Sequence, residues 1–333
     1  MYDYGTFSFD SKAQVLERAK EFWNPDKTQF WTDSGVDLVI DRRQDYFLWD
    51  MSGRRLIDMH LNGGTYNLGH RNPEVMQALT EGMQYFDVGN HHFPSVARTA
   101  LAQKLIESAP ESLSKVAFGS GGGEAIDIAL KSARHATQRR KIVSIVKAYH
   151  GHTGLAVATG DDRFAKLFLS DRPDEFVQVP FGDTDAMEQA LRGRDVAAVI
   201  METIPATYGF PLPPIGYLED VKDLCVRYDA LYIADIFAEG LARIQADYPD
   251  WFVGIRQNGV VIGLEFNHPE GAKFVMRELY QNGVWAIFST LDPRVLQFKP
   301  GLLLGRDLCE DVLDRVEVAV GRAQQAATGR RKP

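Results

Sequence analysis

A run of glycines between two regular segments is the strongest local sign of chemistry in the sequence. Phe118-Gly119-Ser120-Gly121-Gly122-Gly123-Glu124 lies between an expected short strand, Lys115–Phe118, and a segment with helical spacing, Glu124–Arg140. Free N–H groups at the start of a helix form an anion site, and glycine lets a phosphate approach the backbone closely. The loop therefore predicts either a phosphate cradle or a merely flexible connection. It is not the dinucleotide fingerprint, because Glu124 stands where the third glycine would be.

Three further candidates come just after runs that we expect to be buried strands. They are Tyr149-His150-Gly151 after Lys141–Val146, Glu202 after Val196–Met201, and Asp235 after Leu231–Ala234. Ligands of open α/β sheets bind outside the carboxyl ends of the strands, so all of these features could line one crevice. A phosphate cradle, an aromatic face and a carboxylate suit a flat, cationic, phosphorylated ring. Taken singly, Tyr149 could be a packing aromatic, Asp235 a helix cap and Glu202 a solvated loop residue.

The elements that must position these residues alternate between strand and helix. The expected helices between the strands are Asp185–Leu191 and Tyr217–Tyr228. This alternation predicts a mostly parallel sheet with helices on both faces. The end of the chain differs and favours a smaller α+β domain. Its expected strands are Gly259–Phe266 and Arg294–Phe298, and its expected helices are Gly271–Asn282 and Asp307–Ala323. Nearer the N-terminus we expect strands at Val36–Ile40 and Tyr46–Trp49, a helix that begins at Pro73 and another over Ser95–Ser108.

Composition narrows the class of protein. The 333 residues suggest about two domains, and 45% hydrophobic with 25% charged residues is an ordinary globular composition. The net charge of −8 argues against a nucleic-acid partner. The two cysteines, Cys225 and Cys309, cannot form a disulfide framework, and no His/Asp/Glu/Cys set has metal-ligand spacing. Without a signal pattern or a membrane-length apolar run, we expect a cytoplasmic protein with no metal and no membrane partner.

Several separate motifs in one order give the sequence a resemblance to a known family. It resembles the class III aminotransferases, which are pyridoxal-phosphate enzymes of fold type I, from about Asp58 to Asp235 and again from about Gly240 to Val320. The matching segments are Asn67–Pro73, Ala117–Ala133, Ala148-Tyr149-His150-Gly151, Val199–Glu202, Leu231–Asp235 and Val295–Pro300. The resemblance implies a homodimer and a division into an N-terminal part of the small domain (1–70), a large cofactor-binding domain (71–240) and a C-terminal small domain (241–333).

The resemblance also implies roles for individual residues toward pyridoxal 5'-phosphate. Gly122 and Gly123 would hold the phosphate through backbone N–H groups. Tyr149, in the same motif as His150, would stack on the ring. Asp235 would pair with the protonated ring nitrogen, and Glu202 would lie on the ring hydroxyl side and order the site. Gly121 and Gly123 stand where hydroxyl residues are common in the family, so side-chain contacts to the phosphate are expected to be lost.

One departure from the family concerns the lysine that forms a Schiff base with the cofactor. In the family this lysine lies on a loop well after the counterpart of Asp235, and here no lysine occurs between Lys222 and Lys273. Lys273 and Lys299 match segments of the small domain, so we assign the role to neither. The catalytic lysine is therefore unknown. About 100 residues of the large domain, by comparison with a typical family length, are missing after Asp235.

Two explanations of this departure are open. In the first, the protein carries a further segment between Asp235 and Ile236; in the second, the two residues are directly joined and the chain is a silent deletion relative. We favour the first, because the flanking segments are intact and a deletion of interior strands would expose sheet edges. Residues from Ile236 to Ile244 are expected to be helical.

The resulting functional hypothesis is a transaminase that moves an amino group between an amino donor and a 2-oxo acid. The alternatives are an aminomutase, decarboxylase or racemase of the same fold, and a non-catalytic scaffold that dimerises or binds the cofactor. The expected substrate-facing stretches, Asn62–Tyr66 and Asn90–Pro94, do not identify a substrate.

Overall fold

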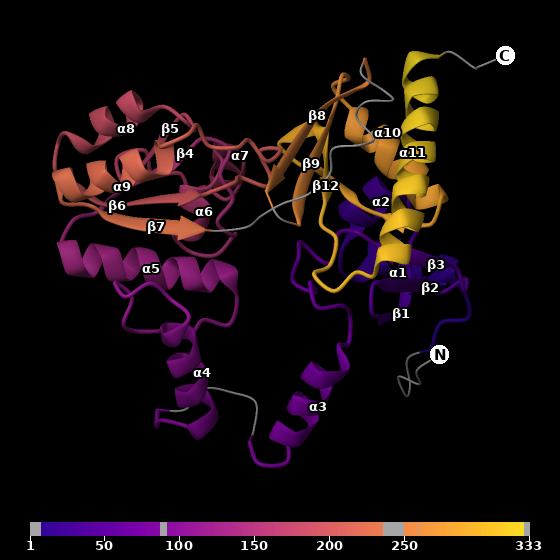
Figure 1. The fold of residues 1–333 in the computed structure, drawn as a ribbon, viewed down its shortest axis with the longest axis horizontal. Helices are drawn as coiled ribbons and strands as arrows, with labels where there is room; N and C mark the ends of the chain where they lie inside the picture. The colour runs from indigo at the N-terminus through magenta and orange to yellow at the C-terminus, as the bar shows by residue number, and fades with distance from the viewer. Residues whose placement is uncertain (1–7, 87–91, 236–249, 259, 330–333) are drawn as a thin grey trace. The chain divides into compact units, whose positions relative to one another are not determined.

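The computed structural model describes residues 8–86, 92–235, 250–258 and 260–329. The chain divides into two compact units (Figure 1). Unit 1 contains residues Met1–Val75, Thr203–Leu212 and Ile236–Pro333, and unit 2 contains Met76–Glu202 and Pro213–Asp235. Each unit has its own buried core; unit 2 contains one sheet and unit 1 contains two.

Unit 2 is built on a parallel sheet of four strands in the order β5-β4-β6-β7. The strands are β4 (Lys141–Ile145), β5 (Phe176–Val179), β6 (Val196–Glu202) and β7 (Leu231–Asp235). Every residue of β6 is buried. A continuous apolar run of this kind is typical of a parallel strand that is covered on both faces. The order places the ends of β4, β6 and β7 side by side at one edge of the sheet.

Helices cover both faces of this sheet, as Figure 1 shows for α8 and α9 on one side and α5 on the other. One face packs on α8 (Thr184–Leu191) and α9 (Tyr217–Tyr228) through side chains such as Met187 and Val221. The other face packs on α5 (Gly122–Thr137) and the short α6 (Ala156–Thr159) through Leu130, Ala133 and Ala158. Because the apolar stripe of α5 packs on the sheet, it fixes the position of the whole helix, including its first turn.

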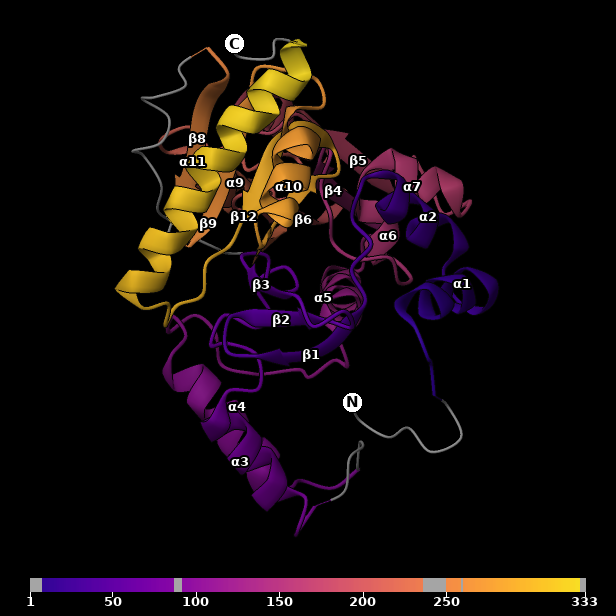
Figure 2. The same cartoon turned by 90° about the vertical axis from the view of Figure 1, so that its right-hand side faces the viewer.

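Unit 1 contains two sheets of four strands each. The first has the order β1-β2-β3-β10, with β10 parallel to β3 and the other pairs antiparallel. Figure 2 shows β1, β2 and β3 of this sheet. The second is antiparallel in the order β11-β12-β9-β8. Their strands are β1 (Ile40–Gln44), β2 (Phe47–Asp50), β3 (Arg55–Asp58), β8 (Phe252–Asn258), β9 (Val261–Phe266), β10 (Val284–Trp285), β11 (Ile287–Ser289) and β12 (Asp292–Phe298).

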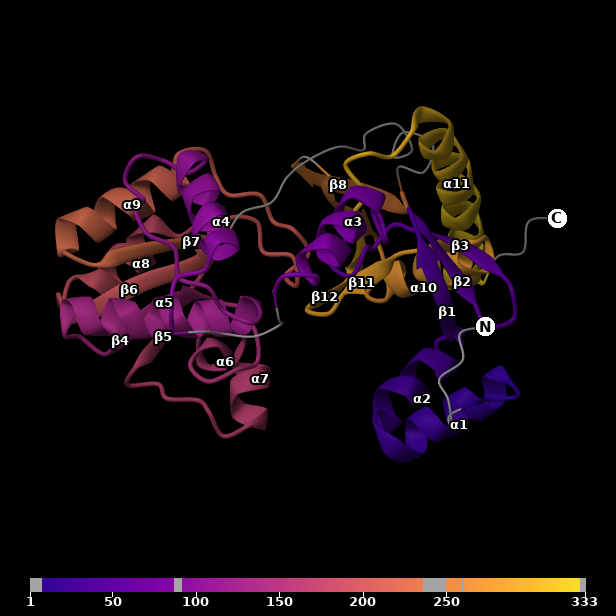
Figure 3. The ribbon, with the colours of Figure 1, turned by 90° about the horizontal axis from the view of Figure 1, so that it is seen from below.

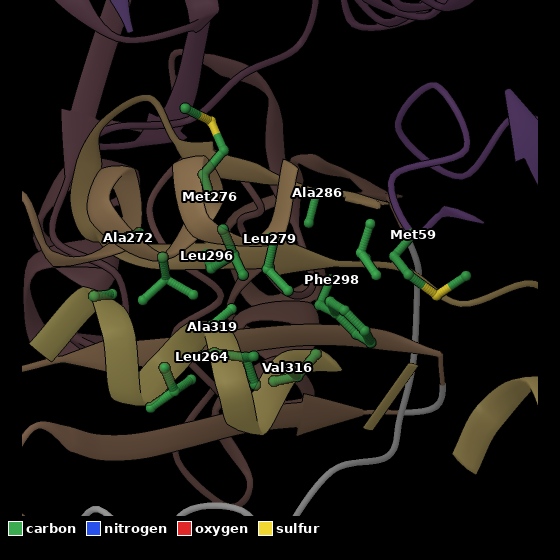
Figure 4. Close-up of a cluster of buried hydrophobic side chains, with 14 of the residues drawn as sticks. Met59, Leu264, Ala272, Met276, Leu279, Ala286, Leu296, Phe298, Val316 and Ala319 are labelled. Atoms are coloured by element: carbon green, nitrogen blue, oxygen red, sulfur yellow. The ribbon is translucent and has the colours of Figure 1, made fainter. Parts of the chain in front are cut away.

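The core of unit 1 lies between the second sheet and two helices, α10 (Gly271–Gln281) and α11 (Arg306–Thr328). Figure 4 shows Val316 and Ala319 of α11 beside Leu264 and Leu296, which are partners in the β9–β12 ladder. Val312, Val316 and Val320 repeat at four-residue spacing and are all buried. This stripe therefore packs α11 into the core of unit 1.

The remaining helices complete the two units. They are α1 (Lys12–Phe22), α2 (Pro25–Asp33), α3 (Pro73–Gly82), α4 (Val96–Glu107) and α7 (Asp162–Leu167). α1 and α2 pack against each other (Figure 3). Ser95 caps α4 by accepting a hydrogen bond from the N–H of Arg98. None of the helices in the described ranges is both long and apolar enough to cross a membrane.

Most of the expected elements are confirmed, and two are wrong. α9 has the predicted bounds, and β4, β6, β7, α8, α10 and β12 differ from them by one or two residues. Lys115–Phe118 is not a strand, because it pairs with no strand among the described residues and an extended segment needs such a neighbour. In place of Val36–Ile40 the strand is Ile40–Gln44, since pairing with Phe47–Asp50 sets its register.

Two expectations fall outside the residues that the structure describes. These are the helix from Ile236 to Ile244 and part of the stretch Asn90–Pro94. The predicted domain boundaries at 70/71 and 240/241 stay a prediction. The predicted large domain, 71–240, contains residues 203–212, whereas in the structure these residues cluster with unit 1 through Ile204 and Phe210.

Candidate functional site

The first turn of α5 presents backbone donors without acceptors. The N–H groups of Gly122, Gly123 and Glu124 donate to no atom in the described part of the chain. A Cβ added at Gly121 or Gly122 would meet nothing within 4 Å. The first N–H groups of a helix and its dipole together attract an anion. The predicted cradle therefore has open space in front of its donors.

The loop after β4 lies directly on this glycine loop. Gly151 has φ +105°, and a Cβ added there would come within 2.7 Å of the Cα of Gly123. A Cβ on Gly123 would in turn come within 2.8 Å of the Thr153 hydroxyl oxygen. Two backbones can approach this closely only when both positions lack a side chain. Gly123 thus serves the packing of the two loops in addition to any contact with a phosphate.

A buried carboxylate of α5 holds the far side of the same loop. Asp127 accepts a hydrogen bond of 2.8 Å from the backbone N–H of Ala156, and its Oδ2 lies beside Gly154. The side chain is only 8% exposed, on the face of α5 that also buries Leu130 and Ala133. The sequence reasoning missed this residue. The available signal was an aspartate in the apolar stripe of an amphipathic helix, where an unpaired charge would be costly.

The loop after β4 is also tied to the end of β6. Glu202 is buried, and its Oε2 accepts a hydrogen bond of 3.0 Å from the backbone N–H of Tyr149. The ring of Tyr149 is 39% exposed and makes edge contacts with His152 and Phe164. Glu202 is therefore not a solvated loop residue; its carboxylate helps to fix the position of an accessible aromatic ring.

Asp235 occupies the last position of β7, in register with Glu202 on the neighbouring strand. Adjacent strands lie about 4.8 Å apart, so the two backbones end side by side. The chain of contacts then runs from Gly123 to Gly151, from Tyr149 to Glu202 and from Glu202 to Asp235. All of the predicted site residues lie in unit 2.

His150 is a buried imidazole within this arrangement. Its side chain is 4% exposed, and neither ring nitrogen has a hydrogen-bond partner among the described residues. Burial lowers the pKa of His150 to about 4, because the protonated ring would lose its hydration without gaining a counterion. The ring is therefore neutral near pH 7, and two polar atoms remain available to a ligand or water.

Lys273 and Lys299, to which the sequence assigns no cofactor role, lie in unit 1. Lys273, in α10, forms an ion pair with Glu270, with Nζ 2.5 Å from Oε2. Lys299 is buried, and its Nζ donates to Gln297 at 2.9 Å. Burial of a lysine was not expected at this position. Neither observation assigns either residue to the cofactor.

Comparison with known proteins identifies the family. The family model for aminotransferase class III matches residues 31–243. An uncharacterized aminotransferase of Archaeoglobus fulgidus is 46% identical over 232 residues, which cover 70% of this chain and 54% of the relative. The chain belongs to the class III aminotransferase family. It spans about half the length of that relative.

Other relatives carry a different activity in their names. A glutamate-1-semialdehyde 2,1-aminomutase of Chloroflexus aurantiacus is 31% identical over 312 residues, covering 89% of this chain and 70% of the aminomutase. Among solved structures, the ornithine aminotransferase of Toxoplasma gondii matches with a TM-score of 0.81 at 17% identity, covering 96% of this chain and 97% of that one. This likeness confirms the predicted fold class, fold type I, with a mostly parallel α/β sheet and a smaller α+β part.

Class III aminotransferases are pyridoxal-phosphate enzymes, so the family establishes the cofactor. The residues described above fit part of the pyridoxal phosphate molecule. The free N–H groups and open space at Gly122 suit a phosphate, and the exposed ring of Tyr149 suits an aromatic ring. No lysine occurs between Lys222 and Lys273, and the role of the family's lysine stays unassigned.

Proposed function

We propose that this class III aminotransferase transfers an amino group between an amino donor and a 2-oxo acid with pyridoxal phosphate. One observation supports this most: the glycine loop, the Tyr149 loop and the ends of β6 and β7 are linked by direct contacts at one edge of a parallel sheet. Ligands of α/β sheets bind at such an edge. The residues there match the charges and shape of a phosphorylated, protonated ring.

Each proposed residue has a distinct part in holding the cofactor. The N–H groups of Gly122 and Gly123 donate to the phosphate, and Tyr149 covers one face of the ring. Asp235 accepts a hydrogen bond from the ring nitrogen and keeps it protonated. Glu202 positions the loop that carries Tyr149. When bound, the cofactor supplies an electron-withdrawing ring for reactions at the substrate's Cα.

Two alternatives each have an observation in their favour. The absence of a lysine between Lys222 and Lys273 favours a scaffold that binds the cofactor without turnover. The aminomutase relatives favour an internal transfer of the amino group. A decarboxylase or a racemase would use the same cofactor-binding residues.

A homodimer is part of the proposal. Apolar side chains of α4 are exposed in the single chain, with Val96 at 81%, Leu101 at 51% and Leu105 at 43%. Val96 and Leu105 lie on opposite sides of α4, because nine residues make two and a half turns of a helix. Apolar side chains exposed in this way are available to a second subunit, which is consistent with the homodimer that the family resemblance predicts.

The first test is borohydride reduction of the purified protein followed by peptide mass analysis. We expect the reduced cofactor to be attached to a lysine, and we expect amino-group exchange between an amino acid and a 2-oxo acid. The same peptide masses read the sequence across Asp235 and Ile236, and so separate the two explanations of the missing lysine. Absence of both attached cofactor and exchange would establish the scaffold instead; conversion of an amino substrate into its positional isomer would establish the aminomutase.

Replacing Asp235 by alanine is expected to weaken cofactor binding by roughly 10- to 100-fold, because a charged hydrogen bond of about 1.5–3 kcal/mol is lost. Turnover should fall strongly, since the ring nitrogen then loses its proton. Spectroscopic titration with pyridoxal phosphate measures the affinity. Asp235→Asn keeps the size of the side chain and should still show the defect. Unchanged affinity and turnover in both variants would refute the assignment.

A further inference from the structure

A basic pocket lies at the surface of unit 1, outside the cofactor residues. Its volume is about 410 Å³, and it is lined by Ile40, Asp41, Arg42, Arg43, Tyr66, His70 and Arg71. Three arginines and one aspartate are thus among the residues that line a space of the size that small ligands occupy. We propose that this pocket, the arginine pocket, binds a small dianionic phosphate, either inorganic phosphate or a phosphate monoester.

Two of the three arginines lie over aromatic rings, and none of the three has a carboxylate partner among the described residues. Arg42 lies over the ring of Trp49, with 3.9 Å from its Cζ to the ring centroid, and Arg43 lies over Tyr66 at 5.9 Å. Throughout the described ranges, no ion pair or hydrogen bond involves the guanidinium of Arg42, Arg43 or Arg71. Stacking on an aromatic face leaves the N–H edge of a guanidinium available for an anion.

The wall opposite β1 is fixed by buried polar contacts. Asp45 and His70 pair as an antiparallel bridge, in which the Asp45 N–H donates to the His70 carbonyl at 2.9 Å. The His70 Nε2 lies 2.8 Å from Oδ2 of the buried Asp58. Arg71 follows immediately, in the left-handed region at φ 53°. These contacts fix the backbone beside Arg71 in the wall of the pocket that Arg43 also lines, which lowers the entropic cost of binding.

The number and arrangement of the arginines favour phosphate over a carboxylate. A carboxylate has two oxygens in one plane and is satisfied by one guanidinium fork. A phosphate has three free oxygens and nearly two charges, so it can accept from donors in three directions. The protein as a whole carries a charge of −8, which repels anions at long range. The local positive charge is therefore best suited to a small anion that enters the pocket itself.

The test is calorimetric titration of the full chain with inorganic phosphate and, separately, with glycerol 3-phosphate. The protein is first saturated with pyridoxal phosphate and freed of excess, so that the glycine loop of unit 2 is already occupied. We expect saturable binding of at least one of the two ligands. The double variant Arg43→Ala/Arg71→Ala should weaken it about tenfold or more, because two charged hydrogen-bond donors are lost.

Two comparisons make the result specific to the arginine pocket, one with a variant and one with a different anion. Arg55→Ala removes an exposed arginine of the same unit that also lies over an aromatic ring, Phe47, and it should leave the affinity within about twofold. The proposal is overturned if no saturable binding occurs, if the double variant binds as tightly as the parent, or if succinate binds more tightly than either phosphate.

Discussion

Gly151→Ala is expected to destabilise unit 2 by about 3 kcal/mol, which combines strain at a positive φ with overpacking. Gly151 has φ +105°, a conformation that side chains of L-residues rarely adopt. The added Cβ would also lie 2.7 Å from the Cα of Gly123, and this neighbour is backbone at the start of α5. The loop after β4 must then move away from the glycine loop, which separates the two parts of the proposed cofactor site.

Hydrogen exchange of the β4 and β6 amides measures the stability of unit 2 in this variant. Gly122→Ala is the matched control, because the same Cβ there meets nothing within 4 Å. It should be neutral or stabilising by up to about 1 kcal/mol, since alanine restricts the unfolded chain. The Gly151 variant should also lose pyridoxal phosphate on gel filtration. Protection factors in Gly151→Ala equal to those in Gly122→Ala would contradict the close packing of the two loops.

The elements that the sequence predicted best are those with local or continuous signals. β6 is a run of apolar residues long enough for one buried strand, and α9 combines a helical apolar stripe with Gly216 before it and Asp229 after it in the left-handed region. Such patterns need no knowledge of the rest of the chain. The strand β1 was placed several residues too early, because its position depends on pairing with β2 and not on its own composition.

The sequence could place the candidate residues at the ends of strands, but it could not give their contacts. Residues at the ends of parallel strands must meet at one edge, and this rule anticipated that Glu202 and Asp235 are neighbours. It could not show that Glu202 holds the backbone of Tyr149, or that Asp127 holds the far end of the same loop. Both contacts join residues distant in sequence, and a buried carboxylate finds its partner only in the folded chain. The arginine pocket was missed for the same reason, since Arg43 and Arg71 come to line one pocket where the Asp45–His70 bridge joins their two segments.

Unit 2 is expected to lose about 3 kcal/mol of stability between pH 7 and pH 4 because of His150 alone. Burial lowers the pKa of this histidine to about 4 in the folded state, whereas its ordinary value is 6.5. Between these two values the unfolded chain binds a proton that the folded chain does not. Stability is therefore fully present above about pH 6.5 and is lost progressively as the pH falls toward 4. Neither ring nitrogen has a hydrogen-bond partner in the described residues that could offset this cost.

His150→Leu separates this contribution from other acid effects. Leucine has a similar volume and no titratable group. The loss of stability between pH 7 and pH 4, measured by exchange of the β4 and β6 amides, should therefore be about 3 kcal/mol smaller in the variant, whatever its stability at pH 7. His60 in unit 1 also has its pKa lowered to about 4, by burial and by the nearby charge of Lys299, and its effect remains in both proteins. His135→Leu, at an exposed position of α5, should leave the pH profile of unit 2 unchanged. If His150→Leu keeps the parent profile, a proton-accepting partner must reach the ring, and the imidazole would then be available as a charged group near the proposed cofactor site.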